Sequence, residues 1–244
     1  MMFRLTPAVK VLVILNIAVF IVQHTVDTYL GGNYTGWLGL VPSAVVMKLW
    51  IWQLFTYSFL HADVLHLFLN MLMIVFIGSE LESGWGIVRF LKYYFFCSIA
   101  AGILYLFFQA FIQSGIHTPM VGASGGIYGL LTAYGILFGE RTLLFMLIFP
   151  MKAKQFIWIL AGMEFLSSFF SPSGGVSSVA HLSGMGAGFV YLWGRAYWIA
   201  RQRMKVILKS LPLREGGAAS KAKTSKTSHL KLVIDNEEDS KTWH

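Results

Sequence analysis

Long apolar stretches, separated by short polar segments, fill the first 200 residues of this chain. A helix that crosses a membrane needs about 17–25 mostly apolar residues. Six stretches meet this requirement, at roughly 8–26, 58–78, 90–112, 122–139, 155–171 and 178–199. In the first, Arg4 and Lys10 precede the apolar run Val11–Val22 as in a signal peptide, but no small-x-small cleavage motif comes after that run, so we interpret it as a span. The pattern predicts an all-α membrane protein with six transmembrane helices.

Two segments between the expected spans are not simple polar connections. The loop 27–57 is rich in glycine and tryptophan, and we predict a structured outer loop that is partly embedded in the membrane. The apolar stretch Leu143–Phe149 is too short to cross by itself. Because Pro150 follows it, we interpret it either as an interfacial piece or as an early, kinked entry to the fifth span.

The basic residues predict the orientation of the spans, because lysine and arginine in loops resist translocation. With six spans and a cytoplasmic N-terminus, 18 of the 19 Lys and Arg residues lie on the inner side and only Lys48 lies outside. We therefore predict cytoplasmic N- and C-termini. We expect an integral, multi-pass protein of a bacterial inner membrane.

Composition supports the same class of protein. Hydrophobic residues make up 56% of the chain and charged residues 12%, against about 25% charged in an average soluble protein. Half of the 30 charged residues fall in residues 201–244. This leaves too few charges for a soluble enzyme or a nucleic-acid binder, and one cysteine, Cys97, excludes a disulfide scaffold. We predict a membrane domain over 1–200 and a basic, disordered cytoplasmic tail over 201–244 that contacts lipid headgroups.

Polar side chains inside the expected spans are the candidates for function, because burying them in a membrane is costly. The second span carries His61, His66 and Asn70, the fourth Ser124 and Tyr128, the sixth His181, and the fifth Glu164. Each alone has an ordinary explanation: small residues serve packing, and a lone histidine near a helix end reaches the interface. Glu164 either pairs locally or faces a wet cavity, and its role stays open.

Topology gives three of these clusters a shared location. Spans two, four and six all run from outside to inside, so their first halves lie in the outer leaflet. Ser124 and His181 each lie within about 5 Å of the start of their span, at 1.5 Å per residue. Glycines on spans four and six would let these helices approach closely. A nucleophile and a base at one depth predict an acyl-transfer site.

Other intramembrane chemistries lack their sequence signals. The segment from His61 to His66 lacks the His-Glu-x-x-His spacing of a zinc peptidase. Glu164 has no evident acidic partner for an aspartyl dyad, and Cys97 has apolar neighbours that make it a poor nucleophile. No metal or other cofactor is expected.

Four sequence blocks, in order, resemble the rhomboid family of intramembrane serine proteases over roughly residues 50–190. The blocks are Trp52-Gln53-Leu54-Phe55-Thr56, then His61, His66 and Asn70, then Gly122-x-Ser124-Gly125 with Tyr128, and finally Ala180-His181-x-x-Gly184-x-x-x-Gly188. Gly78-x-x-x-Glu82 also resembles the family's inner-loop acidic position. Gln53 departs from the family, which usually has arginine there, and this departure bears on the anchoring of the loop.

The resemblance implies a rhomboid-like six-helix bundle and a Ser-His dyad. Ser124 would be the nucleophile, His181 the general base, and Tyr128 would pack on the His181 ring and orient it. The oxyanion would be held by the Ser124 backbone N–H, the Asn70 amide and the His66 ring. The implied partners are transmembrane protein substrates, cleaved within or near their spans, and no nucleic acid.

Two alternatives from other classes stay open. An inactive rhomboid-like protein would bind transmembrane helices without cleaving them, but such relatives usually lack the dyad. A small transporter could use Glu164 and His66 in a proton relay, although the chain shows no repeated halves.

Overall fold

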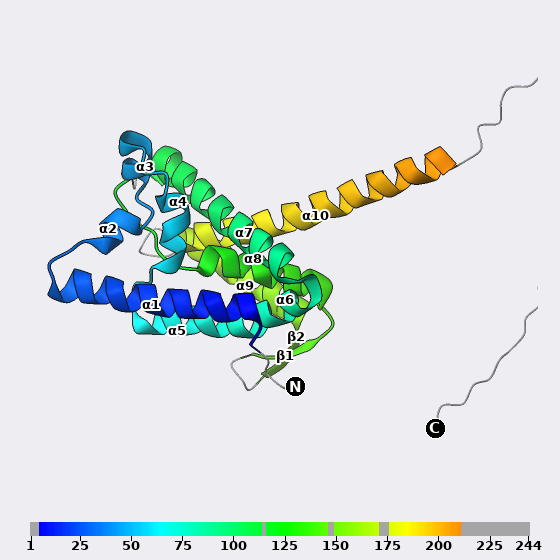
Figure 1. Cartoon of the computed structure of the whole chain (residues 1–244), viewed down its shortest axis with the longest axis horizontal. Helices are drawn as coiled ribbons and strands as arrows, with labels where there is room; N and C mark the ends of the chain where they lie inside the picture. The colour runs from blue at the N-terminus through cyan, green and yellow to red at the C-terminus, as the bar shows by residue number, and fades with distance from the viewer. Residues whose placement is uncertain (1–4, 114–115, 146–148, 171–175, 211–244) are drawn as a thin grey trace, which may run out of the picture. The chain divides into compact units, whose positions relative to one another are not determined.

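The computed structural model describes residues 5–113, 116–145, 149–170 and 176–210, and helices dominate this part of the chain (Figure 1). The longer helical segments are α1 (Pro7–Tyr29), α5 (Val64–Met73) with the π-helical η2 (Ile74–Gly78) and α6 (Ser79–Trp85), α7 (Ile87–Phe108) with η3 (Gln109–Gln113), α8 (Ser124–Leu137), α9 (Ala153–Phe170) and α10 (Val176–Ser210). Each of the six predicted spans thus coincides with one of these helical segments.

Three of the segments are long and apolar enough to cross a membrane by themselves. They are Pro7–Tyr29, Val64–Trp85 and Ile87–Phe111. At 1.5 Å per residue the 14 residues of α8 extend only about 21 Å, less than the roughly 30 Å of a bilayer's hydrocarbon core. A spanning role for α8, α9 and α10 therefore stays a prediction.

A short hairpin lies where an entirely helical chain was expected. β1 (Thr142–Phe145) pairs antiparallel with β2 (Phe149–Lys152), with Thr142 opposite Lys152. Of the two alternatives for Leu143–Phe149, an early, kinked entry to the fifth span is wrong, since the described residues at its two ends are strands and Pro150 restricts the preceding residue to extended backbone. The other alternative, an interfacial piece, stays a prediction. The chain is mostly helical rather than all-α, and α9 begins only after the hairpin.

Lysines anchor the hairpin to the end of the preceding loop. Lys152 Nζ lies 2.7 Å from a carboxylate oxygen of the exposed Glu140, and Lys154 pairs with its other oxygen. The hydrogen bonds from Lys152 and Lys154 lower the pKa of Glu140 to about 2. The turn before α9 is thus fixed by exposed ion pairs.

The loop 30–57 is structured, as predicted. It contains three short helices, α2 (Tyr34–Leu38), α3 (Pro42–Lys48) and α4 (Gln53–Thr56), followed by the 3₁₀ turn η1 (Tyr57–Phe59). The indole ring of Trp50 stacks on that of Trp52, with centroids 5.5 Å apart, and is tilted against that of Trp37 at 5.7 Å. Its partial embedding in the membrane stays a prediction.

Gln53 holds this loop together in place of the family's arginine. Its side chain is fully buried. Its Oε1 accepts from the Val41 N–H at 3.0 Å, and its Nε2 donates to the carbonyls of Gly36 at 3.0 Å and Trp37 at 3.2 Å. A neutral amide therefore meets the donor and the acceptors of the loop backbone without burying a charge.

Glu82 fixes the start of α1. Its carboxylate accepts from the Thr6 hydroxyl at 2.5 Å and from the backbone N–H groups of Ala8 at 3.0 Å and Val9 at 2.9 Å. The first N–H groups of a helix have no acceptor within it, and a carboxylate there also favours the helix dipole. The acidic residue predicted at the inner loop therefore caps the first helix.

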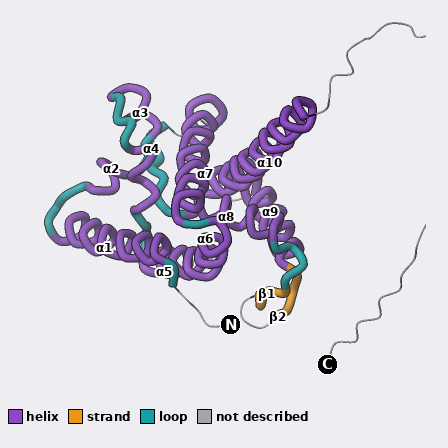
Figure 2. The backbone as a smooth tube through the Cα atoms, turned by 45° about the vertical axis from the view of Figure 1, so that its right-hand side comes forward, coloured by secondary structure: helices purple, strands orange, loops and turns teal. Residues whose placement is uncertain are grey.

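The fourth long helix, α8, lies within the bundle and packs against α5, α7 and α9 (Figure 2). Its buried face includes Gly125, Gly126, Leu130 and Ala133. Residues 202–244 form a separate unit. The disordered tail was predicted over 201–244, but the structure describes its first residues, 201–210, as the helical and mostly exposed end of α10. The rest of the predicted tail, 211–244, lies outside the described residues.

Candidate active site

Ser124 is the first residue of α8, and a hydrogen bond joins it to α10. Its Oγ lies 2.8 Å from Nε2 of His181. The sequence separation is 57 residues, so this contact depends on the packing of the two helices. The structure thus brings together the two residues that the sequence placed at a common depth.

Glycines allow α8 and α10 to approach closely. Gly184 lies one turn after His181, and a methyl group at Gly184 would collide with the Gly125 carbonyl oxygen. One further turn along, a methyl group at Gly188 would lie 3.1 Å from the carbonyl oxygen of Gly129 on α8. The backbones therefore meet directly, which sets the position of the imidazole over the start of α8.

Tyr128 lies one turn after Ser124 and stacks on the imidazole, as predicted from the resemblance. The ring centroids of Tyr128 and His181 are 4.1 Å apart and the planes differ by 7°. This face-to-face contact restricts the tilt of the imidazole. The stacked ring leaves rotation within the ring plane to be fixed by hydrogen bonds at the two ring nitrogens.

Glu164, which the sequence left unassigned, contacts both aromatic rings. Its Oε1 lies 2.9 Å from Nδ1 of His181 and also accepts a hydrogen bond from the Tyr128 hydroxyl. Both partners of the Glu164–His181 pair are largely shielded, with side chains 14% and 17% exposed respectively.

His66 lies against the backbone that leads into α8. Gly122 has φ +127°, and a Cβ there would lie 2.9 Å from Cε1 and 3.0 Å from Nε2 of the His66 ring. A side chain at this position would therefore be strained and would displace the ring. Asp63 caps α5 by accepting from the His66 N–H at 2.8 Å, which fixes the turn that carries the ring.

Asn70 lies one turn further along α5, on the same face as His66. It is 7% exposed, and its Nδ2 has no hydrogen-bond partner within the part of the chain that the structure describes. A buried amide without a partner is costly. The Asn70 Nδ2 therefore makes no direct hydrogen bond with Ser124 in the structure.

His61 contacts α1 and the His66 ring. Its backbone N–H and carbonyl bond to the side chain of Gln23 on α1, at 3.1 Å and 3.0 Å. Its buried ring packs edge-on against the His66 ring at 5.1 Å. Across the described ranges, no group of three or more His, Cys, Asp or Glu residues is arranged to hold a metal ion.

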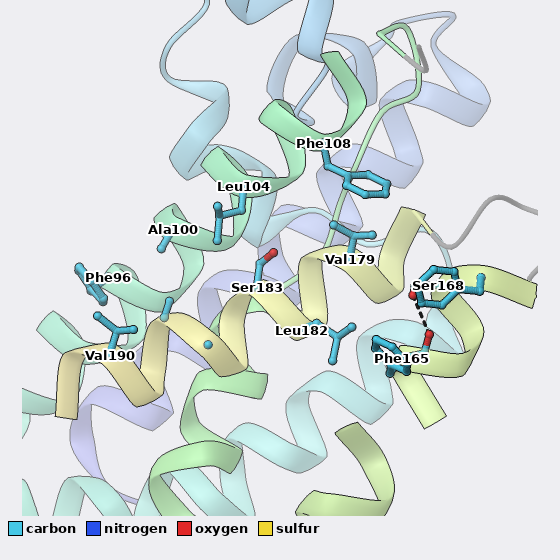
Figure 3. Close-up of a pocket in the computed structure, with 13 residues that line it drawn as sticks. Phe96, Ala100, Leu104, Phe108, Phe165, Ser168, Val179, Leu182, Ser183 and Val190 are labelled. Carbon is cyan, nitrogen blue, oxygen red and sulfur yellow. Dashed lines mark hydrogen bonds between the residues drawn. The ribbon is translucent and has the colours of Figure 1, made fainter. Parts of the chain in front are cut away.

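A wide apolar groove opens elsewhere, between α7, α9 and α10 (Figure 3). Its volume is about 960 Å³, and it is lined by residues such as Phe96, Leu104, Phe165, Val179 and Leu182. The hydroxyl of Ser168 in its wall already donates to the Phe165 carbonyl at 2.6 Å. None of the residues that line the groove is titratable, so its lining offers no acid, base or metal ligand.

Comparison with known proteins identifies the family. The model of the rhomboid domain matches residues 48–198. The chain belongs to the rhomboid family. This family of integral membrane proteins includes intramembrane serine proteases and acts on transmembrane substrates.

Curated relatives agree with this assignment. RHOMBOID-like protein 1 of Arabidopsis thaliana is 34% identical over 156 residues, which cover 61% of this chain and 35% of that protein. Rhomboid protein 1, mitochondrial, of Saccharomyces cerevisiae is 27% identical over 149 residues, or 61% and 43% of the two chains. Rhomboid-like protease 3 of Toxoplasma gondii is 34% identical over 91 residues, or 37% and 35%. The chain thus spans less than half the length of these relatives.

Proposed function

We propose that this rhomboid is an active intramembrane serine endopeptidase that cleaves transmembrane proteins within or near their spans. The observation that carries the proposal is the 2.8 Å contact between Ser124 Oγ and His181 Nε2. A serine hydroxyl is a weak nucleophile unless a base accepts its proton, and this distance is within hydrogen-bond reach. The name of the Toxoplasma relative, a rhomboid-like protease, supports the same activity.

Ser124 and His181 act in two steps. Ser124 Oγ attacks the substrate carbonyl carbon while its proton passes to His181 Nε2, and the imidazolium then gives this proton to the leaving amine as the peptide C–N bond breaks. In the second step His181 takes a proton from water, the resulting hydroxide attacks the acyl-enzyme carbonyl, and Ser124 regains its proton. No cofactor takes part in either step.

Three donors stabilise the oxyanion that forms in each step. The Ser124 backbone N–H belongs to the first turn of α8, where N–H groups have no acceptor within the helix. The unpartnered Asn70 Nδ2 and the His66 ring supply the side-chain donors. Donors held in place before the reaction act strongly in a site shielded from bulk water.

We further propose that all six long helical segments span the membrane as a rhomboid-like bundle over residues 1–200. The short α8 then leaves room for water above Ser124, which hydrolysis requires. The distribution of lysine and arginine supports cytoplasmic N- and C-termini, and a bacterial inner membrane is the location we expect. A substrate helix must unwind before its carbonyls become accessible, so Gly, Ser or Pro near its outer end favours cleavage.

The test of this function uses purified protein in lipid vesicles with a panel of single-span membrane proteins. The wild-type chain should cleave at least one of them near its outer end, and Ser124→Ala should cleave none. Ser168→Ala is the matched control and should cleave normally, because within the described residues that hydroxyl donates to the Phe165 carbonyl on its own helix. Equal cleavage by wild type and Ser124→Ala in a preparation free of other proteases would refute the proposal. A wild-type protein that binds the substrates without cleaving any would favour the inactive rhomboid-like alternative.

A further inference from the structure

We propose that Glu164 completes the site as a positioning residue, so that this rhomboid works with a Ser-His-Glu triad rather than a Ser-His dyad. The inference rests on the proposed protease function and adds the orientation of its base. Glu164 comes from α9, so three helices rather than two supply the reacting group and its support.

The geometry at His181 is that of a base held on both sides. Nε2 lies 2.8 Å from Ser124 Oγ, and Nδ1 lies 2.9 Å from Glu164 Oε1. The ring face stacks on Tyr128. Tyr128 thus limits tilting of the imidazole out of its plane, while Glu164 limits rotation of the imidazole within its plane. The two contacts restrain different motions, so neither replaces the other.

The carboxylate also selects the tautomer of His181. An ionised carboxylate has no hydrogen of its own, so the hydrogen between Glu164 Oε1 and the ring is on Nδ1. A neutral imidazole protonated at Nδ1 has its lone pair at Nε2, which faces the Ser124 hydroxyl. The Tyr128 hydroxyl donates to the same carboxylate oxygen. When His181 takes the serine proton, the same negative charge stabilises the imidazolium.

A purely structural role is the competing explanation, and the chain contains an example of one. Tyr134 donates to the carboxylate of Glu80 at 2.7 Å, and Arg141 pairs with the same carboxylate. That Tyr–Glu contact joins α8 to α6 without a histidine. The contact between Tyr128 and Glu164 could likewise do no more than join α8 to α9. The distinguishing feature is the bond from Glu164 to Nδ1 of His181.

Two substitutions separate these roles. Glu164→Gln keeps an oxygen that accepts from the Tyr128 hydroxyl but removes the negative charge and the fixed tautomer. Tyr128→Phe removes the hydroxyl contact but keeps the ring that stacks on His181 and keeps the carboxylate. A positioning role predicts a severe loss for Glu164→Gln and a mild loss for Tyr128→Phe. A joining role predicts the reverse order.

The readout is the reaction of Ser124 with a fluorophosphonate, in which serine Oγ bonds to phosphorus, fluoride leaves and the serine proton passes to His181. The end-point stoichiometry counts the folded sites, and the rate constant per labelled site reports the reactivity of Ser124 whatever fraction folds. In proteases with a Ser-His-Asp triad, neutralising the acid lowers kcat by about 10⁴. Because Tyr128 still orients the ring, we expect Glu164→Gln to lower the labelling rate and kcat by about 10²–10⁴ with unchanged stoichiometry and KM.

Glu80→Gln, which likewise removes the charge of a carboxylate that accepts from a tyrosine but has no histidine beside it, is the matched control and should leave the rate per labelled site at the wild-type value. A wild-type rate per labelled site in Glu164→Gln would overturn the triad, even if fewer sites fold. A loss in Tyr128→Phe equal to that in Glu164→Gln would overturn it as well. Both outcomes leave the protease function intact, whereas a wild-type protein that neither labels nor cleaves would refute the function itself.

Discussion

Replacing Gly184 by alanine tests whether the approach of α8 and α10 sets the catalytic geometry. The added methyl group would collide with the Gly125 carbonyl oxygen and would lie 3.0 Å from the Gly125 carbonyl carbon and 3.2 Å from its Cα. All three are backbone atoms at the start of α8, so no side chain can rotate away. The whole of α10 has to shift near His181, which lies one turn before Gly184.

The structure sets the size of the effect. The ordinary contact distance of a Cβ is 3.4–4 Å, so the helix backbones must separate. A misplacement of about 1 Å at a catalytic group can lower a rate by about 10²-fold. Overpacking of a core typically costs about 1–3 kcal/mol of stability, and replacing glycine by alanine within a helix returns up to about 1 kcal/mol. We therefore expect kcat to fall by about 10²-fold while the protein still folds.

The assay measures kcat on a single-span substrate and the thermal unfolding midpoint of the same preparation. Gly186→Ala is the matched control, because nothing lies within 4 Å of a Cβ at that position on the same helix. It should retain wild-type kcat and an equal or slightly higher midpoint. Wild-type kcat in Gly184→Ala would refute the argument that backbone contact positions His181, and an equal loss in Gly186→Ala would refute the assignment of the effect to Gly125.

Three further results are expected. Gln53→Ala removes the three hydrogen bonds of the buried Gln53 side chain, worth about 1 kcal/mol each. Thermal unfolding should therefore show a loss of about 3 kcal/mol in the free energy of unfolding, and an unchanged midpoint would contradict this role. Asn70→Ala should lower kcat by about 10²–10³ with an unchanged midpoint, and undiminished kcat would remove Asn70 from the oxyanion site. Chelator treatment should leave cleavage intact, and loss of cleavage that zinc restores would argue against a serine mechanism.

The sequence predicted those features of the fold and site that depend on periodicity and on helix direction. Apolar stretches placed the helical segments, and alternating direction placed Ser124 and His181 at one depth. The contact between these side chains follows from that placement together with the glycines, since Gly125 and Gly184 allow the backbones to meet. The role of the Gln53 side chain in holding its loop was also foreseeable in part, because an amide can donate hydrogen bonds to backbone carbonyls.

Other features were missed because they depend on contacts that a single segment does not encode. Glu164 lies six residues before the last residue of α9, or about 9 Å from that end. This puts Glu164 in the same half of the membrane as Ser124 and His181 if the fifth span runs from inside to outside, and an intramembrane carboxylate is a functional candidate by default. The partner of Glu164 is a histidine on another helix rather than a second carboxylate, and that contact depends on the packing of α9 against α10. The hairpin before α9 was missed because its short apolar run lacked the alternation that marks a strand.

The most direct test of the proposed mechanism is to locate the fluorophosphonate adduct by mass spectrometry of the digested protein. The account predicts one adduct, on the peptide that contains Ser124, and almost none in His181→Ala, since the hydroxyl then has no base. An adduct on another residue would contradict the account. So would a protein that cleaves substrate actively although its Ser124 does not react with the reagent at saturation.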